Sequence, residues 1–355
     1  MTWGRLAIRA ACGAALSSAL GCAALPWPSG PERPDEAVPA GAYYDLRGAV
    51  HVHTRASHDS AGEIGDLVDA AHGAGLAFVA LTEHPRRSRF VPAKGVVEGV
   101  ILIPGWELGT AGGSILALGV EHRRGLPRND PHALVEAIHA RGGAAFVGHL
   151  ELSGLADPER YAAADPDGIE IVNLHAAANE HRFALAFGSL FLPAYLAQRP
   201  LLDPPTANLA RLAQLPGVRG LVGGVDAHAK FRLLGPLGGT FDRYRDLFRL
   251  VTTHVLARDR SQRSILDALR AGRSYVAFEG LGLVEQFVAV RVAEGVRVQA
   301  PGEAELRLVC AGASVATLEG SEALFAPPPD AERCHVEAWK GSDLWVVTSP
   351  LGPPS

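Results

Sequence analysis

Between residues 46 and 280, short apolar runs alternate with stretches whose apolar residues recur at helical spacing. The runs have strand length and are bounded by Gly or Pro, which is typical of buried parallel strands. The seven runs are 46–54, 76–84, 99–107, 114–120, 143–150, 168–175 and 220–228. Helices are predicted over 64–74 and over 131–141, the latter with Asp130 as N-cap. Seven strands with helices between them predict an α/β barrel or a near relative of one.

The two ends of the chain have different patterns. After residue 285, apolar and polar residues alternate, which predicts antiparallel strands and a small β-sandwich. At the other end, a basic start and a short apolar stretch precede a segment rich in Pro, Ala and Gly. We therefore expect four parts: a signal segment (1–21), a tether (22–44), an α/β barrel (45–282) and a C-terminal β domain (283–355).

The N-terminal stretch ends in Ala-Leu-Gly-Cys at 19–22, which resembles a bacterial lipobox. On this interpretation the protein is exported and anchored in the bacterial envelope by a lipid on Cys22. A plain cleaved signal peptide and an uncleaved anchor are the alternatives, although the apolar stretch is short for a bilayer span. Export would place Cys310 and Cys334 in an oxidising compartment, where they either pair or remain two unrelated strand cysteines.

Composition narrows the range of partners. The chain has 48% hydrophobic and 20% charged residues, as a globular protein does. Its net charge is −5 and no basic stripe is evident, so nucleic acid is not expected as a partner. The 14 histidines are a stronger signal, because histidine is the commonest side-chain ligand of metals.

Metal-ligand residue types gather where the predicted strands finish. His51 with His53, and Asp226 with His228, are spaced at i and i+2, so each pair points to one face of its strand. The other runs end in His84, Glu107, His149 and His175. Barrel enzymes build their active sites at this end of the strands. Imidazole with carboxylate suits Zn, Mn or Fe(II), and two or more such ions make a hydrolytic centre.

The same residues resemble the motifs of the PHP (polymerase and histidinol phosphatase) metallohydrolases. In the family's order, the matching segments are 51–54 (HVHT), 57–60 (SHDS), 81–84 (LTEH), 105–107 (GWE), 148–149 (GH), 168–173 (GIEIVN) and 224–228 (GVDAH). This resemblance covers residues 45–280 and implies a distorted seven-stranded β/α barrel that holds two or three divalent ions. Segments 244–257 and 271–276, with the β tail, resemble the branch that includes carbaryl hydrolase (CehA/McbA-like).

The resemblance also assigns ligands. It implies that a first metal is held by His51, His53, Glu107 and Asp226. Glu107 then bridges to a second metal that takes His149, and a third metal takes His58, His84 and His228.

The second site departs from the family pattern, because Ser114 stands where many relatives carry a histidine. His122 or His175 could substitute, or the second site is weaker. We favour His175 as the nearby ligand or substrate contact.

The implied activity is hydrolysis of a phosphoester, or of a carbamate or amide in the carbaryl hydrolase branch, by water that the metals activate. Asp59 is a candidate proton acceptor near the third metal, with a turn residue as the alternative. Arg232, like Lys230 and Arg182, could clamp a phosphate or carboxylate, or could be a solvated surface residue.

Two questions stay open in the sequence. Glu170 and Asn173 could orient ligands from behind, or could be plain packing residues. The rival function is a surface-tethered binding protein that keeps the metal cluster and uses its β domain to hold a glycan, lipid or protein. The sequence does not indicate an oligomeric state.

Overall fold

The computed structural model describes residues 37–38, 43–85, 92–192, 194–230, 242–329, 331 and 333–352. The predicted signal segment, Cys22 and most of the tether lie outside the described residues, as does Arg232. Within the described part, none of the helices combines the length and the apolar character needed to cross a membrane.

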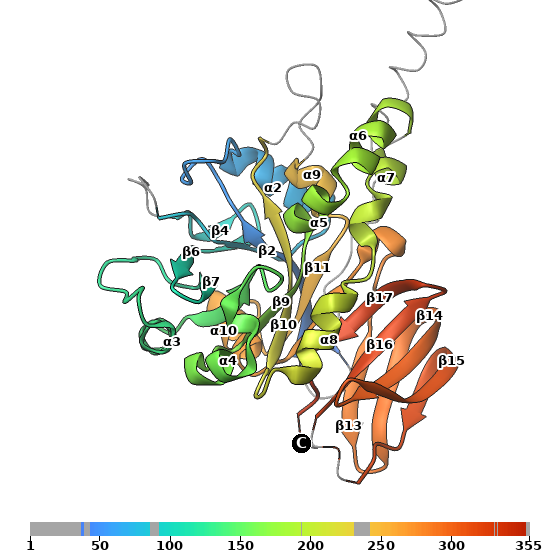
Figure 1. The fold of residues 1–355 in the computed structure, drawn as a ribbon. Coiled ribbons are helices and arrows are strands. Elements are labelled where there is room, and N and C mark those ends of the chain that lie inside the picture. Colours follow the sequence, from blue (N-terminus) through green and yellow to red (C-terminus); the bar gives the residue numbers. More distant parts are fainter. Residues whose placement is uncertain are drawn as a thin grey trace, which may run out of the picture.

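The described strands join in one mixed sheet of seventeen strands (Figure 1). Those before the C-terminal region are β1 (Ala37–Val38), β2 (Tyr43–Val52), β3 (Phe78–Leu81), β4 (Gly95–Val97), β5 (Val100–Ile103), β6 (Gly105–Thr110), β7 (Gly113–Leu118), β8 (Ala144–Gly148), β9 (Gly168–Asn173), β10 (Gly220–Ala227), β11 (Thr252–Ala257) and β12 (Ser274–Ala277). β2 has β3 and β10 as parallel neighbours, and its first half pairs antiparallel with β11. Parallel pairing continues from β3 to β5, and from β10 through β9 to β8. Parallel pairing is therefore present for β2, β3, β5, β8, β9 and β10.

The predicted closed barrel is not confirmed. β7 pairs antiparallel with both β6 and β8, whereas neighbouring strands of a β/α barrel are parallel. β6 reaches β3 only through an isolated bridge between Glu83 and Trp106. The physical cause lies at Pro104, which divides the expected run 99–107 into β5 and β6, because proline lacks the N–H that a ladder needs. The strands form an open mixed sheet.

Helices cover both faces of the sheet. They are α2 (Ile64–Gly73), α3 (Pro131–His139), α4 (Pro158–Ala164), α5 (Leu174–Glu180), α6 (Arg182–Phe191), α7 (Ala194–Ala197), α8 (Thr206–Gln214), α9 (Tyr244–Leu247) and α10 (Gln262–Arg270), with short 3₁₀ turns at η1 (Gly154–Ala156), η2 (Arg199–Leu202) and η4 (Glu279–Leu281). One apolar core lies between the strands and the helices α2, α3, α4 and α8, and α10 packs in a second core. α3 begins as predicted, since the Asp130 carboxylate accepts a hydrogen bond from Ala133 N at 3.1 Å, but it ends at His139.

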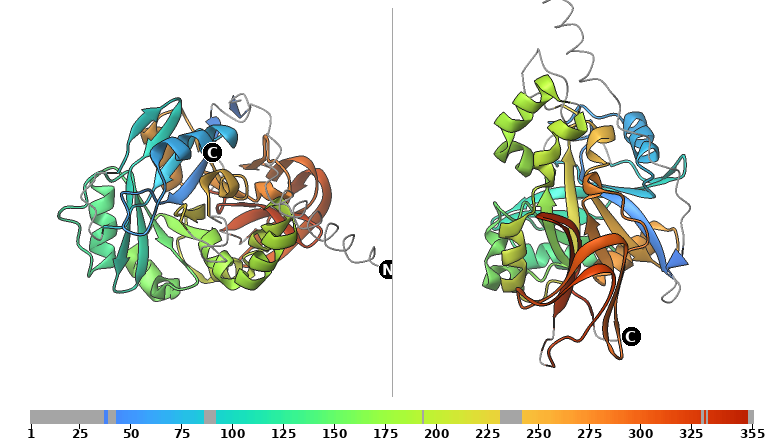
Figure 2. Two further views of the ribbon diagram at one scale, coloured as in Figure 1. Left: turned by 90° about the horizontal axis from the view of Figure 1, so that it is seen from above. Right: turned by 90° about the vertical axis from the view of Figure 1, so that its right-hand side faces the viewer.

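The C-terminal strands are antiparallel, as expected. They are β13 (Val288–Val292), β14 (Gly295–Cys310), β15 (Ala313–Phe325), β16 (Cys334–Lys340) and β17 (Asp343–Thr348). A register shift between Gln299 and Ala304 lets the long β14 pair first with β13 and then with β16. β17 pairs with β12, so these strands continue the main sheet while they enclose a core of their own (Figure 2, orange and red).

Cys310 and Cys334 form a disulfide, which decides between the two alternatives that the sequence left open. They are paired residues on β14 and β16. Replacing both by alanine is expected to lower the free energy of unfolding by about 3 kcal/mol, because the cross-link removes chain entropy from the unfolded state. The loop that it closes corresponds to a sequence separation of 24. Urea unfolding of the oxidised protein and the double variant measures this loss, and equal midpoints would contradict it.

Candidate metal centre

Metal-ligand side chains from several strands meet around a cavity of about 480 Å³. Its lining consists of Asp59, His84, Glu107, His149, His175, Asp226, His228, Lys230 and Asp242. His51 and His53, at the end of β2, adjoin this lining and are fully buried. The structure therefore brings together residues that the sequence placed on separate strands.

Three residues lie differently along their strands than the sequence suggested. Glu107 does not end a strand but is the third residue of β6. His84 lies beyond the end of β3 at Leu81, next to the bridge between Glu83 and Trp106. His175 is not at a strand end, because it is the second residue of α5.

The backbone at three of these positions is left-handed. The φ angles are 64° at His51, 47° at His149 and 48° at Asp226. This conformation is uncommon for residues other than glycine and tends to occur at functional sites. Register shifts between Val50 and Val52 and between Gly224 and Ala227 accompany two of them. Such irregularities re-aim side chains, so the strand ends here present imidazole and carboxylate groups toward one another. The i, i+2 spacing alone did not predict this.

Three groups of side chains could each hold a metal ion, with ligand atoms within 4.8 Å of one another. The groups are His51, His53 and Asp226; His51, Glu107 and His149; and His53, His84 and His228. In the first, Asp226 Oδ1 lies 3.5 Å from His51 Nε2 and 3.3 Å from His53 Nε2. In the second, the Glu107 oxygens lie 3.4 Å from His51 Nε2 and 3.3 Å from His149 Nε2.

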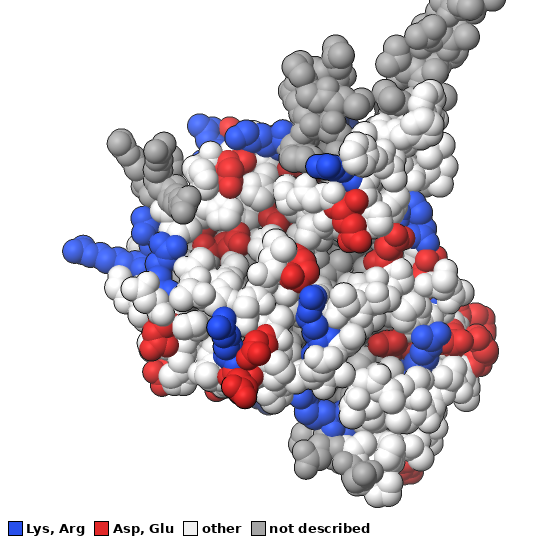
Figure 3. All heavy atoms as spheres, in the orientation of Figure 1, with Lys and Arg blue, Asp and Glu red and all other residues white. Residues whose placement is uncertain are grey.

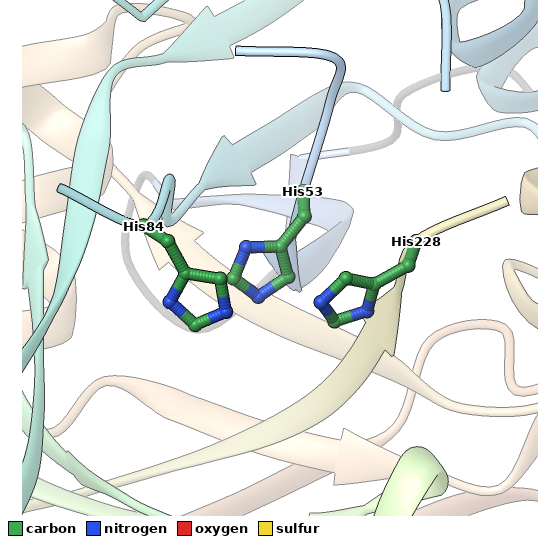
Figure 4. A group of neighbouring side chains, drawn as sticks. All are labelled: His53, His84 and His228. Carbon is green, nitrogen blue, oxygen red and sulfur yellow. The ribbon is translucent and has the colours of Figure 1, made fainter. Parts of the chain in front are cut away.

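The third group is made of imidazoles alone. The ring of His53 stacks between the other two, 4.4 Å from His84 and 4.2 Å from His228 (Figure 4). His58, which the resemblance assigned here, has a side chain 42% exposed, and its ring lies 5.5 Å from that of His84. The structure thus groups His53 with His84 and His228, and the assignment of His58 to this site stays a prediction.

Two buried atoms at the centre support metal binding. His53 Nε2 and Asp226 Oδ1 are buried without a hydrogen-bond partner among the described residues. An unsatisfied buried polar atom is costly, and a cation between an imidazole nitrogen and a carboxylate oxygen would satisfy both. The donor set of nitrogen and oxygen atoms fits Zn, Mn or Fe, because calcium prefers oxygen ligands alone.

Glu170 and Asn173 hold the ligands in place. Glu170 is buried, and its oxygens lie 2.6 Å from His51 Nδ1 and 2.7 Å from the backbone nitrogen of His149. Asn173 donates from its amide to Glu170 and to Asp226, at 3.1 and 3.2 Å. A carboxylate behind a ligating imidazole fixes the ring's tautomer and orientation. The orienting alternative therefore describes these two residues better than plain packing.

Glu83 also holds residues of the centre in place, a role that the sequence did not reveal. Its carboxylate accepts hydrogen bonds from the backbone and hydroxyl of Thr54 and from the Ser57 hydroxyl, at distances from 2.5 to 3.2 Å. The Ser57 oxygen in turn accepts from His84 N at 2.8 Å. Asp242 is also new: it accepts from His228 N at 3.0 Å. The motif Leu-Thr-Glu-His was visible at 81–84, but only contacts across the fold show what Glu83 binds.

Of the remaining candidates, three lie at the cavity or its ligands and His122 does not. Ser114 donates a 2.8 Å hydrogen bond to Glu107, so it supports that carboxylate. His122 is 70% exposed beside Glu121 and is not among the cavity residues, whereas His175 lines the cavity with its ring 5.7 Å from His228. Asp59 also lines the cavity, 3.3 Å from His84 Nε2.

Burial and neighbouring charges shift the pKa values of the centre in opposite directions. Burial lowers the pKa of His53 to about 3. For His149, hydrogen bonds to Glu107 and Glu151 outweigh burial and raise the pKa to about 10. The neighbouring histidines, despite burial, hold the pKa values of Glu107 and Asp226 well below their usual range. The metal-free centre thus combines protonated imidazole with ionised carboxylate.

Metal binding is expected to release protons and to strengthen as pH rises from 6 toward 9, because a metal ligates only neutral imidazole. The pKa of His149 in the fold is about 10, above the ordinary 6.5, so its proton stabilises the metal-free protein fully below pH 6.5. That stability is lost as pH rises through about 10. Calorimetric titration with Zn in buffers of different ionisation enthalpy measures the protons released. A heat independent of the buffer would contradict the prediction.

Comparison with known proteins gives little more. No family model and no curated protein matches this chain. A matching solved structure is a two-domain protein from Bacteroides vulgatus ATCC 8482 that contains a predicted PHP-like metal-dependent phosphoesterase. It is 18% identical, the match covers 91% of this chain and 100% of that one, and the TM-score is 0.44. Similarity at this level supports no conclusion about the chain's activity.

Proposed function

We propose that the chain is a metal-dependent hydrolase of the PHP type. The observation that carries the proposal is the set of three ligand groups around one cavity, with two buried ligand atoms that lack a described hydrogen-bond partner. Two or three ions would be held by His51, His53, His58, His84, Glu107, His149, Asp226 and His228. When bound, such ions lower the pKa of water and polarise the electrophile's oxygen.

The protein's own residues have separate roles in this proposal. Asp59 accepts the proton, since its carboxylate lines the cavity beside His84 and His58, at 3.3 and 3.7 Å. His175 contacts the substrate from the start of α5. Glu170 and Glu83 keep the ligands oriented from behind.

A phosphoester is the substrate class that Lys230 favours. Lys230 is the one Lys or Arg among the described residues that line the cavity, and it has no carboxylate of the described part within ion-pair distance. An ammonium at the cavity matches an anionic phosphoester better than a neutral carbamate. The face shown in Figure 3 mixes acidic and basic side chains over its described part.

The test is hydrolysis of p-nitrophenyl phosphate and of a neutral aryl carbamate by the metal-loaded protein. Lys230→Ala is expected to raise KM for the phosphoester about tenfold and to leave the carbamate reaction unchanged, because only the anion uses the ammonium. Lys230→Arg should retain most of the affinity. If the metal-loaded protein hydrolyses neither compound, the rival interpretation as a tethered binding protein becomes the better one.

We propose separately that the protein is exported and held in the envelope by a lipid on Cys22. The support is the lipobox-like sequence at 19–22 and the Pro-rich tether after it. Cys22→Ser should abolish incorporation of labelled fatty acid into the protein. Unchanged labelling would contradict lipid attachment at this residue.

A further inference from the structure

The arm formed by α6 and α7 carries a cluster of exposed apolar side chains. The cluster consists of Phe183 (76% exposed), Phe187 (68%), Phe191 (65%), Leu192 (42%) and Leu196 (45%). The three phenylalanines are spaced four residues apart and therefore lie along one face of α6, where the rings of Phe187 and Phe191 are 4.9 Å apart. These five are close to half of the eleven exposed large hydrophobic residues in the described part. Such grouping on a surface marks an interaction site.

The opposite face of α6 already has its packing partner. Leu185 is 1% exposed, and Gly188 lies so close to α7 that a Cβ would come within 3.3 Å of Ala197 Cα. The phenylalanine face is therefore the outer face of the arm. The arm projects beyond the sheet and the other helices in two views at right angles (Figures 1 and 2), and in the space-filling view it is white over most of its surface (Figure 3).

The charge pattern of the arm fits an anionic lipid surface. Residues 183–198 contain no charged residue, and Arg182 directly precedes this stretch. Arg199, which follows it, is ion-paired with Asp203 and Asp343. The Arg182 guanidinium lies 4.9 Å from the centre of the Phe183 ring, so a cation and an aromatic ring are presented side by side. Aromatic side chains with a flanking cation are what a helix needs to lie in the headgroup region of a bilayer.

The chain before the described residues points to the same partner. The proposed lipid site, Cys22, precedes Ala37 of β1 by fifteen residues, which span at most about 50 Å when fully extended. Such a tether keeps the folded part close to the bilayer. We infer that the outer face of α6, with Phe183, Phe187, Phe191 and Arg182, docks on an anionic lipid bilayer.

Vesicle co-sedimentation tests this inference on the chain from residue 22 onward with Cys22→Ser, which retains every described residue and carries no lipid. It should bind vesicles that contain a quarter phosphatidylglycerol. The triple variant Phe183→Ser, Phe187→Ser and Phe191→Ser should bind at least about tenfold more weakly. Arg182→Gln should weaken binding to these vesicles about fivefold and should not affect neutral vesicles. The matched control is Leu318→Ser with Leu324→Ser, which removes exposed leucines of β15 and should bind like the parent.

Equal binding by the triple variant and its parent, or no binding by the parent, would overturn the inference. The parent could instead be dimeric by light scattering and bind no vesicles, while the triple variant is monomeric. That result would assign the apolar cluster to contact between two copies of the chain and would also overturn the inference. The thermal midpoint of the triple variant should match that of the parent, which shows that the arm has not unfolded. Vesicle binding needs neither metal nor substrate, so its failure would leave the proposed hydrolase untouched.

Discussion

His53→Ala is expected to reduce hydrolysis by about a thousandfold or more. His53 belongs to two of the three ligand groups, and its ring stacks between those of His84 and His228. Its removal therefore takes one ligand from each of two groups and leaves the rings of His84 and His228 without their stacking partner. Initial rates with p-nitrophenyl phosphate, at saturating metal, measure the loss.

His122→Ala is the matched control for this variant. His122 is 70% exposed beside Glu121, and it is not among the residues that line the cavity, so its removal should leave the rate unchanged. Far-ultraviolet circular dichroism of both variants checks that the fold persists. Comparable losses in the two variants, or full activity in His53→Ala, would contradict the ligand assignment.

The second large effect is expected from Gly224→Ala, a change that touches no ligand directly. A Cβ at Gly224 would lie 1.6 Å from Glu170 Oε1, so the Glu170 carboxylate must move. That carboxylate lies 2.6 Å from His51 Nδ1 and accepts from His149 N. Loss of such an orienting partner typically lowers metal affinity about 10- to 100-fold. Titration of the metal-free variant with Zn measures the affinity.

Gly65→Ala provides the comparison. Gly65 lies in α2, and a Cβ there would have no atom within 4 Å. Alanine at this helical position should raise stability by about 0.5–1 kcal/mol and leave metal affinity unchanged. If Gly224→Ala binds Zn as tightly as Gly65→Ala does, Glu170 does not have the orienting role assigned to it.

The sequence predicted which residues form the site better than it predicted how they are arranged. Apolar runs ending in His or Asp sufficed to place His51, His149 and Asp226 near one another, because parallel strands finish at a common edge. The cap of α3 at Asp130 was predictable for a similar reason, since it depends on residues only three positions apart.

What the sequence missed depends on contacts between distant residues. The antiparallel order of β6, β7 and β8 follows from pairing choices that hydrophobic runs do not encode. Pro104 alone indicated, from the sequence, that the run 99–107 would be divided into two strands. The left-handed backbone of His51 and Asp226 is imposed by the surrounding sheet and leaves no mark on residue type. Asp242 accepts a hydrogen bond from His228 N, which lies fourteen positions earlier in the chain. Asp242 belongs to none of the motifs, so no local pattern could identify it.

The most direct test of the central claim is the metal content per chain, measured by elemental analysis of the protein and of Asp226→Ala after reloading with Zn, Mn or Fe. Asp226 is buried, and its oxygens lie within 3.6 Å of nitrogens of His51, His53, His149 and His228. We expect two or three equivalents in the parent and fewer in the variant. Two equivalents would indicate that Ser114 has weakened the second site. One equivalent or none, unchanged in the variant and not recovered by added metal, would contradict the assignment of this cluster as a metal centre.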